Sequence, residues 1–226
     1  MVYNFFGDKM ETTLYIVRHC EAQGNLKRIF QGLTDLDITE AGQKQLEKLS
    51  QRFSGIKIDA VYSSPLLRAQ KTALAIAEPK GLKVIEDQGL IELNGGVIEG
   101  MSFADIFTNY PKIEDDWLNN PQNFCAPNGE SMRQVYERIW LTVLKIAQQN
   151  KGKTVAVATH GGAIRNLICR ITKGSIEKLN DVGWSENTAV SKLVFDNDFN
   201  VKAEFINDIS HLPSGFISVA AMMEVE

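Results

Sequence analysis

The stretch TLYIVRHCE at residues 13–21 decides the fold of this chain. Its first five residues are β-branched, aromatic or aliphatic without a polar interruption, which is typical of a strand buried on both faces. A second run of the same kind, TVAVAT, occupies residues 154–159. Strands buried on both faces occur in parallel sheets that helices cover on each side. The two runs therefore predict a parallel sheet at the centre of the chain.

The segments around these two runs alternate between short apolar stretches and longer amphipathic ones. This alternation indicates an α/β sandwich with a mostly parallel sheet. Thr39, Ser64 and Ser131 are the expected helix N-caps, and Gln134 completes a capping box with Ser131. We expect helices at residues 41–53, 64–77, 131–149 and 163–172, short strands at 58–62 and 83–85, and a closing hairpin of strands 189–195 and 201–206.

Size and composition indicate one globular domain that spans residues 1–226. The chain is 44% hydrophobic, has a net charge of −4 and contains three scattered cysteines without a CxxC pair. The acidic balance disfavours nucleic acid and membrane surfaces as partners, because both attract basic patches. Free thiols favour a cytoplasmic location. No apolar run is long enough to span a bilayer, and residues 1–10 resemble an extension or a cloning remnant rather than a signal peptide.

Two of the three histidines of the chain directly follow the two apolar runs. His19 comes after Arg18 at the end of the first run, and His160 begins the sequence His-Gly-Gly after the second. Ligands of open α/β sheets bind beyond the carboxyl ends of the strands, so both side chains should face one crevice. A catalytic zinc site needs about three protein ligands and would be repelled by Arg18. A bound phosphate is therefore favoured over a metal, and either histidine could be its nucleophile.

Further polar residues near the same crevice could contact a phosphate. Arg68 opens a helix that follows a predicted strand, and a guanidinium can bind two phosphoryl oxygens at once. Asn25, Gln31 and Gly32 could add neutral hydrogen-bond donors. Glu92 lies in the mostly apolar stretch LIEL and could act as a general acid. Local sequence leaves Glu21 and Glu99 open as alternatives, whereas the helix dipole better explains Glu130.

Six blocks of sequence resemble the histidine phosphatase (phosphoglycerate mutase-like) superfamily and follow one another in the order of that family. The first carries Arg-His-Cys-Glu where the family has Arg-His-Gly-Glu, and the last carries the second His-Gly pair. The blocks are LYIVRHCEAQGN, FQGLTDLDITEAG, YSSPLLRAQKTA, LIELNGGVIEG, PNGES and ATHGGAIRNL, between residues 14 and 167.

The resemblance implies a three-layer α/β/α sandwich and a metal-independent phosphatase that needs no cofactor. It assigns His19 as the nucleophile and Glu92 as the proton donor, with His160 completing the catalytic set. The expected substrate is a small phosphorylated metabolite, and a homodimer remains an option. The residues implied to bind the phosphate or substrate are Arg18, Asn25, Gln31, Gly32, Arg68 and Gly161.

Two alternatives to hydrolysis remain open at this point. A phosphoglycerate mutase would carry a longer insert before the second His-Gly block, so the short segment here favours a phosphatase. Cys20 replaces the usual glycine, which could impair the phosphate site and leave a binding protein without activity. A thiol next to Arg18 and His19 should also have a lowered pKa and be sensitive to oxidation.

The segment 95–130 is expected to form a lid over the crevice. It contains aromatic residues and several carboxylates, but Lys112 is its only basic residue. Such a lid offers little to compensate a second phosphate. The sequence therefore predicts a preference for monophosphates with an uncharged, partly apolar leaving group.

Overall fold

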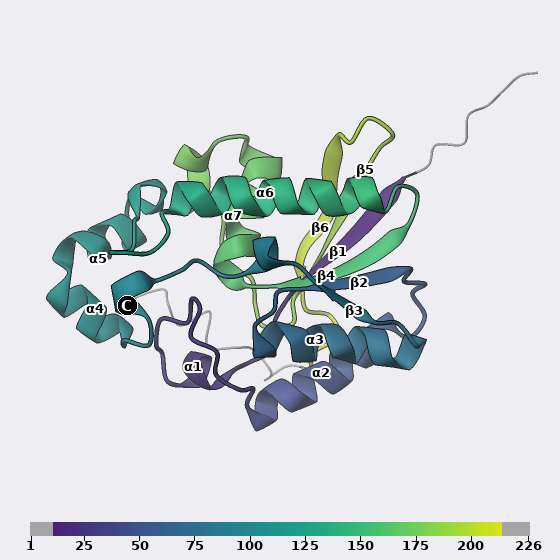
Figure 1. Cartoon of the computed structure of the whole chain (residues 1–226), viewed down its shortest axis with the longest axis horizontal. Helices are drawn as coiled ribbons and strands as arrows, with labels where there is room; N and C mark the ends of the chain where they lie inside the picture. Colours follow the sequence, from purple (N-terminus) through teal and green to yellow (C-terminus); the bar gives the residue numbers. More distant parts are fainter. Residues whose placement is uncertain (1–10, 214–226) are drawn as a thin grey trace, which may run out of the picture.

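A six-stranded sheet forms the centre of the computed structural model, which describes residues 11–213. The strands that precede His19 and His160 are neighbours, as the two apolar runs predict, and the C-terminal hairpin adds two antiparallel strands at one edge. The mostly parallel sheet is thereby confirmed (Figure 1). In spatial order the strands are β3 (Val84–Glu86), β2 (Ala60–Ser63), β4 (Thr154–Thr159), β1 (Thr12–Arg18), β5 (Val190–Phe195) and β6 (Val201–Asp208).

Helices cover both faces of the sheet, which confirms the predicted three-layer α/β/α arrangement (Figure 1). Two helices, α2 (Glu40–Phe53) and α3 (Leu67–Ala77), lie on one face, and two others, α6 (Met132–Gln149) and α7 (Gly161–Lys173), lie on the other. The shorter helices are α1 (Gln23–Leu26), α4 (Phe103–Asn109) and α5 (Pro111–Leu118), and the 3-10 turns are η1 (Glu78–Lys80), η2 (Gln88–Leu90), η3 (Gly96–Ile98), η4 (Pro121–Asn123) and η5 (Ile176–Asp181).

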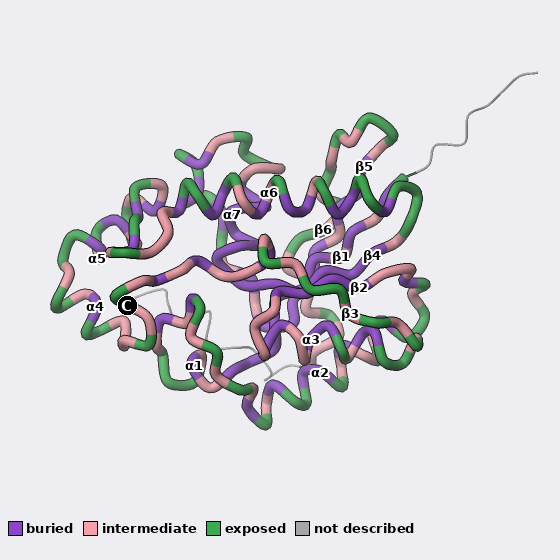
Figure 2. The backbone as a smooth tube through the Cα atoms, viewed as in Figure 1, coloured by how far each residue is buried: buried purple, intermediate pink, exposed green. Residues whose placement is uncertain are grey.

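The register of β1 against β4 decides where the site lies. Arg18 pairs with Thr159, so both strands end at the same level. Burial explains this pairing, because the two strands are apolar on both faces and are buried along most of their length (Figure 2). Consequently His19 and His160, one residue beyond each strand, come together although 141 positions separate them in the sequence.

The expected helix caps are confirmed at two of the three positions. The Thr39 hydroxyl accepts from the backbone N–H of Gly42, and Ser131 forms a capping box with Gln134. The prediction for Ser64 is wrong, because α3 begins three residues later at Leu67. Ser64 still continues the alignment of β2 with β4, since its N–H donates to the carbonyl of Ala158 at 3.0 Å.

The predicted lid segment, 95–130, contains α4 and α5 and projects at one end of the sheet (Figure 1). Five of its apolar side chains are buried in the larger core cluster: Ile98, Ile106, Ile113, Phe124 and Ala126. Its role as a lid and the single-domain boundary stay predictions, as do the cytoplasmic location and the homodimer. No helix within residues 11–213 is long and apolar enough to cross a membrane. The prediction for residues 1–10 falls outside the described residues.

Candidate active site

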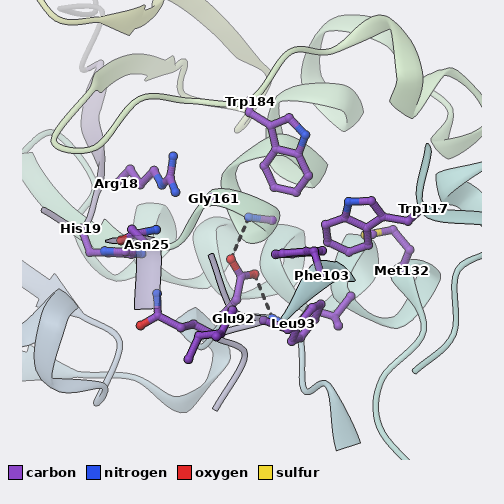
Figure 3. Close-up of a pocket in the computed structure, with 14 residues that line it drawn as sticks. Arg18, His19, Asn25, Glu92, Leu93, Phe103, Trp117, Met132, Gly161 and Trp184 are labelled. Atoms are coloured by element: carbon purple, nitrogen blue, oxygen red, sulfur yellow. Dashed lines mark hydrogen bonds between the residues drawn. The ribbon is translucent and has the colours of Figure 1, made fainter. Parts of the chain in front are cut away.

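A pocket opens at the carboxyl ends of β1 and β4, where the sequence places the crevice. Figure 3 shows Arg18, His19 and Asn25 on one side of it and Phe103, Trp117 and Met132 on the other, with Glu92 between them. Six of the nine predicted site residues line the pocket; Gly32, Arg68 and His160 do not. The lining residues are Arg18, His19, Asn25, Ile29, Phe30, Gln31, Glu92, Leu93, Phe103, Trp117, Met132, Gly161, Gly162 and Trp184.

His19 is held as a neutral imidazole with one free ring nitrogen. Its Nδ1 lies 2.6 Å from the carbonyl oxygen of Cys20. A carbonyl only accepts, so Nδ1 carries the proton and Nε2 keeps its lone pair. Burial, followed by the charges of Arg68 and Arg18, holds the pKa of His19 well below its usual value of 6.5. This is the protonation state that a nucleophilic histidine needs.

A turn after η5 fixes the backbone of His19. The side-chain amide of Asn187 donates to the His19 carbonyl at 2.9 Å, and the N–H of Thr188 donates to the Arg18 carbonyl at 3.1 Å. Thr188 has a φ of 57°, an unfavourable value for a β-branched residue. Strained backbone of this kind is typical of functional sites. The sequence analysis missed this turn, which lies far from both motifs.

His160 lies against His19, with ring centroids 5.2 Å apart. Its Nε2 is 2.8 Å from the hydroxyl oxygen of Ser64, which itself accepts the N–H of Leu66 at 3.3 Å. The Ser64 hydroxyl can donate to Nε2 or accept from it, so this contact fits either neutral tautomer of His160. Burial, followed by the charge of Arg68, holds the pKa of His160 well below 6.5. Its Nδ1 is buried without a hydrogen-bond partner.

Arg68 and Arg18 each keep one nitrogen free beside the histidines. The terminal nitrogens of Arg68 donate at 2.9 to 3.0 Å to the carbonyls of Gln31, Gly32 and Thr34, while its Nε is buried without a partner. Arg18 donates from one terminal nitrogen to the carbonyl of Ser185, and its Nε is likewise unpartnered. Desolvation on burial lowers the pKa of Arg18 to about 10, and it also lowers the pKa of Arg68.

These contacts correct two expectations about the loop. Gly32 does not offer a donor to the pocket; the carbonyls of Gln31 and Gly32 hold Arg68 instead. Arg68 does not present both terminal nitrogens to a ligand, because carbonyls bind them in the interior. Arg68 lies behind the pocket lining, where its Nε is without a partner and its positive charge acts on His19 and His160.

Glu92 lies in the loop after η2 and lines the pocket next to the start of α7. Its carboxylate accepts from the backbone N–H groups of Gly162 at 2.8 Å and Ala163 at 3.1 Å, in the first turn of that helix. The helix macrodipole favours a negative group there. A side chain at Gly162 would come within 2.6 Å of the Glu92 carboxylate, which explains the second glycine of the His-Gly-Gly motif. A Cβ at Gly161 would lie 3.2 Å from the Arg18 Nε.

Arg138 fixes the loop that carries Glu92, a role that the sequence analysis did not identify. It donates to the carbonyls of Gly89 and Ile91 at 3.0 and 2.8 Å. Its remaining nitrogens bind both oxygens of Glu130 at 2.7 and 2.8 Å. Glu130 is therefore the partner of Arg138, a contact that adds to the explanation by the dipole of α6, since Glu130 directly precedes the N-cap Ser131.

The two alternative carboxylates of the sequence analysis are bound elsewhere. Glu21 accepts from the Thr39 hydroxyl at 2.6 Å. Glu99 accepts from the backbone N–H groups of Leu33 and Thr34 at 2.7 and 2.9 Å and so holds the loop that binds Arg68. Neither lines the pocket. Geometry therefore favours Glu92 over both as the general acid.

Cys20 departs from the expectation of a reactive thiol. Its side chain is fully buried and does not line the pocket. Desolvation raises the pKa of the thiol to about 12, so the expected lowering and the expected thiolate are wrong. Cys20 is also absent from the described non-glycine residues with positive φ, so its backbone does not require glycine. Its N–H donates to the Thr72 hydroxyl at 3.0 Å, which anchors it to α3.

Within residues 11–213, no three histidine, cysteine or carboxylate side chains come together as a metal site. The candidate ligand-binding groups of the pocket are instead the donors described above.

The buried histidines predict a loss of stability in mild acid. His19 and His160 have a lower pKa folded than unfolded, so the unfolded chain binds protons first as the pH falls through about 6.5. The free energy of unfolding should be at its highest above about pH 7. Below that pH it should fall by about 1.4 kcal/mol for each histidine with every unit of pH decrease. Urea unfolding at pH 7.5, 6.5 and 5.5 measures this.

His19→Ala provides the control, because it removes one of these protons and should therefore reduce the slope by about 1.4 kcal/mol per pH unit. His211, whose pKa burial lowers to about 4, adds a smaller share because it is partly exposed. Equal stability of the parent protein at pH 7.5 and 5.5 would contradict the neutral, buried histidines.

Comparison with known proteins identifies the family of this chain and proteins that share its fold. The model of the histidine phosphatase superfamily (branch 1) matches residues 14–208. The chain is 32% identical over 204 residues to phosphoserine phosphatase 1 of Hydrogenobacter thermophilus, covering 90% of this chain and 96% of the relative. It is 33% identical over 177 residues to a 2,3-bisphosphoglycerate-dependent phosphoglycerate mutase of Mesorhizobium japonicum, covering 75% and 86%. The solved structure of Bacillus stearothermophilus YhfR superimposes with a TM-score of 0.85 at 27% identity, covering 88% and 98%.

Proposed function

Because this chain belongs to the histidine phosphatase superfamily (branch 1), we propose that it hydrolyses small organic phosphate monoesters through a phosphohistidine at His19, without a metal ion. Phosphatases among its relatives support hydrolysis as the reaction. The proposed substrate is a small phosphorylated metabolite.

One observation carries the proposal: three side chains near the His19 ring each have a buried nitrogen without a hydrogen-bond partner. These nitrogens are the Nε of Arg18, the Nε of Arg68 and the Nδ1 of His160, to which the proposal assigns the proton of that ring. The charges of both arginines reach both histidine rings, since they lower the pKa values of His19 and His160. Unpaired buried donors are costly, so their convergence indicates a place for an anion. A phosphoryl group there would give each donor an oxygen and would place phosphorus before the His19 Nε2.

In the first step, the lone pair of the His19 Nε2 attacks phosphorus and the bond from phosphorus to the ester oxygen breaks. Repulsion between the phosphoryl dianion and the Glu92 carboxylate favours uptake of a proton by Glu92. Glu92 then delivers this proton to the leaving oxygen, which departs as an alcohol. The three free donors stabilise the charge of the equatorial oxygens.

In the second step, water attacks the phosphohistidine from the side that the alcohol has left. Glu92, now a carboxylate, takes one proton from the water, and the bond from Nε2 to phosphorus breaks. Inorganic phosphate leaves, and His19 returns to its neutral form. The hydrogen bond from its Nδ1 to the Cys20 carbonyl keeps the ring oriented through both steps.

The alternative of a member impaired by Cys20 has less support. The backbone at Cys20 has no positive φ, and its thiol is buried away from the pocket. His19, Glu92 and His160 keep the contacts that the two steps need. A phosphoglycerate mutase remains the second candidate, because such enzymes are among the relatives.

Metal independence predicts full activity in a chelator. The protein, dialysed against excess EDTA, should release phosphate from a panel of phosphate monoesters at its original rate, because arginine and histidine donors supply the charge stabilisation. Phosphate release is measured with and without added Mg²⁺ or Zn²⁺. Loss of activity in EDTA that either metal restores would overturn this part of the proposal.

A further inference from the structure

The side of the pocket where an alcohol would leave is an aromatic wall. We define this wall as Phe30, Phe103, Trp117, Met132 and Trp184, which all line the pocket. Phe103, Trp117 and Trp184 are partly exposed, so their surfaces are available to a ligand. Figure 3 shows Phe103, Trp117 and Trp184 facing the space beyond Glu92. This side of the pocket is thus built mainly from aromatic rings.

Packing behind the wall fixes the rings in place. Trp117 stacks on Trp184 with centroids 5.6 Å apart at an interplanar angle of 25°. It also contacts Phe30 and Phe103, each with centroids 5.7 Å away. The Arg165 guanidinium lies 4.8 Å from the Trp184 ring centroid. A preorganised aromatic surface binds a flat ligand with little loss of entropy.

Arg165 is itself held, so it supports the wall rather than serving the ligand. Its Nε donates to the carbonyl of Val182 at 2.8 Å, and a terminal nitrogen donates to the side chain of Asn180 at 3.2 Å. Asn180 in turn donates to the carbonyl of Asn119 at 2.8 Å, next to α5. These bonds join the segment of Trp184 to the helix of Trp117.

The charges of the pocket oppose a leaving group that carries an anion. Among the described lining residues, Arg18 is the only cation and Glu92 the only carboxylate. Arg18 faces the phosphoryl site, where its Nε is free. A carboxylate or second phosphate against the wall would lose water and lie near Glu92, while the one lining cation, Arg18, is engaged by the phosphoryl group in the proposed function.

A buried polar atom belongs to the same pocket as the wall. The side-chain oxygen of Gln31 is buried without a hydrogen-bond partner among the described residues, and Gln31 lines the pocket. It can accept from one hydroxyl or N–H group of a ligand. The side therefore suits an uncharged group with a ring and at most a few polar donors.

We propose that the substrates of this site are monophosphates of uncharged alcohols that bear a flat ring, which packs against Trp184 and Trp117. This inference rests on the proposed phosphatase function and narrows its substrate class. It also separates the chain from its relative named phosphoserine phosphatase, because serine brings a carboxylate to the leaving-group side.

The test compares benzyl phosphate, O-phosphoserine and ethyl phosphate by kcat/KM. Benzyl alcohol is no better a leaving group than the serine hydroxyl, so a preference reports the pocket rather than chemical reactivity. We expect benzyl phosphate to exceed O-phosphoserine by about tenfold or more. Equal values, or a preference for O-phosphoserine, would overturn the inference and leave the phosphatase function intact. Hydrolysis of none of the three esters would overturn both.

A matched pair of tryptophan variants assigns the preference to the wall. Trp184→Leu should lower kcat/KM for benzyl phosphate about tenfold more than it lowers kcat/KM for ethyl phosphate. Trp140→Leu is the control, because Trp140 lies on α6 outside the pocket and contacts Arg170. Equal losses of kcat/KM for both esters in Trp184→Leu would contradict a contact between Trp184 and the ring of the substrate. They would mean that Trp184 acts on the phosphoryl site through Gly161, where an added Cβ would lie 3.5 Å from the Trp184 ring and 3.2 Å from the Arg18 Nε.

Discussion

His19→Ala is expected to abolish turnover and to prevent any acid-labile labelling of the protein by a phosphorylated substrate. The imidazole Nε2 is the atom that would bind phosphorus, and alanine offers no substitute. The loss of kcat should reach roughly 10⁴-fold or more, which is the scale for removal of a covalent nucleophile. Rapid quenching with a ³²P-labelled ester, followed by separation of the intact chain, measures the label directly.

Two controls make this result specific to His19. His211→Asn removes the third histidine of the chain and should label normally. It loses the contact of His211 with the Thr188 hydroxyl at 3.3 Å, but Thr188 holds the Arg18 carbonyl through its backbone N–H, which the substitution leaves in place. Circular dichroism and urea unfolding confirm that His19→Ala is folded. A folded His19→Ala protein that still acquires an acid-labile phosphoryl group would refute His19 as the nucleophile and direct attention to His160.

Glu92→Gln should slow the hydrolysis of alkyl phosphates by roughly 10²- to 10⁴-fold, because glutamine cannot protonate the leaving oxygen. The same variant should lose far less activity towards 4-nitrophenyl phosphate, whose phenolate leaves without a proton. The measurement is the ratio of kcat/KM for ethyl phosphate and 4-nitrophenyl phosphate in parent and variant. That ratio should fall by about tenfold or more.

The comparison of two esters protects this prediction against a structural artefact. Glutamine keeps one oxygen for the N–H groups of Gly162 and Ala163, but it replaces the other with a second donor. Any resulting shift of α7 would slow both esters equally. An equal loss for both would therefore remove Glu92 as the general acid and leave it the role of a partner for the first turn of α7.

Some site residues can be assigned from the sequence alone because their positions follow from strand ends. Periodicity shows where an apolar run stops, and the next polar residue then lies at the edge of the sheet. This reasoning found His19, His160 and Arg18. A different inference failed at Ser64, where a favourable capping sequence predicts the start of a helix. The hydroxyl instead lies against His160, and α3 begins at Leu67.

Charge alone could not separate Glu92 from Glu21 and Glu99, because the three differ only in their distant partners. Glu99 is occupied by a loop 65 residues away, and Glu92 meets a helix 70 residues away. Cys20 shows the same limit of reasoning from sequence neighbours. Its sequence neighbours are charged, but its side chain is buried away from solvent, so desolvation gives its thiol a raised pKa rather than a lowered one.

The sequence by itself determined the layers of the fold, the two central strands and the two histidines beyond them, since burial periodicity and strand ends are local properties. Only the tertiary structure decided that the terminal nitrogens of Arg68 bind carbonyls, that Arg138 anchors the Glu92 loop and that Trp117 stacks on Trp184. Each of these depends on which distant segments meet when the chain closes. The partner of a polar side chain is set by that meeting, whereas its position along a strand or helix is set by its neighbours.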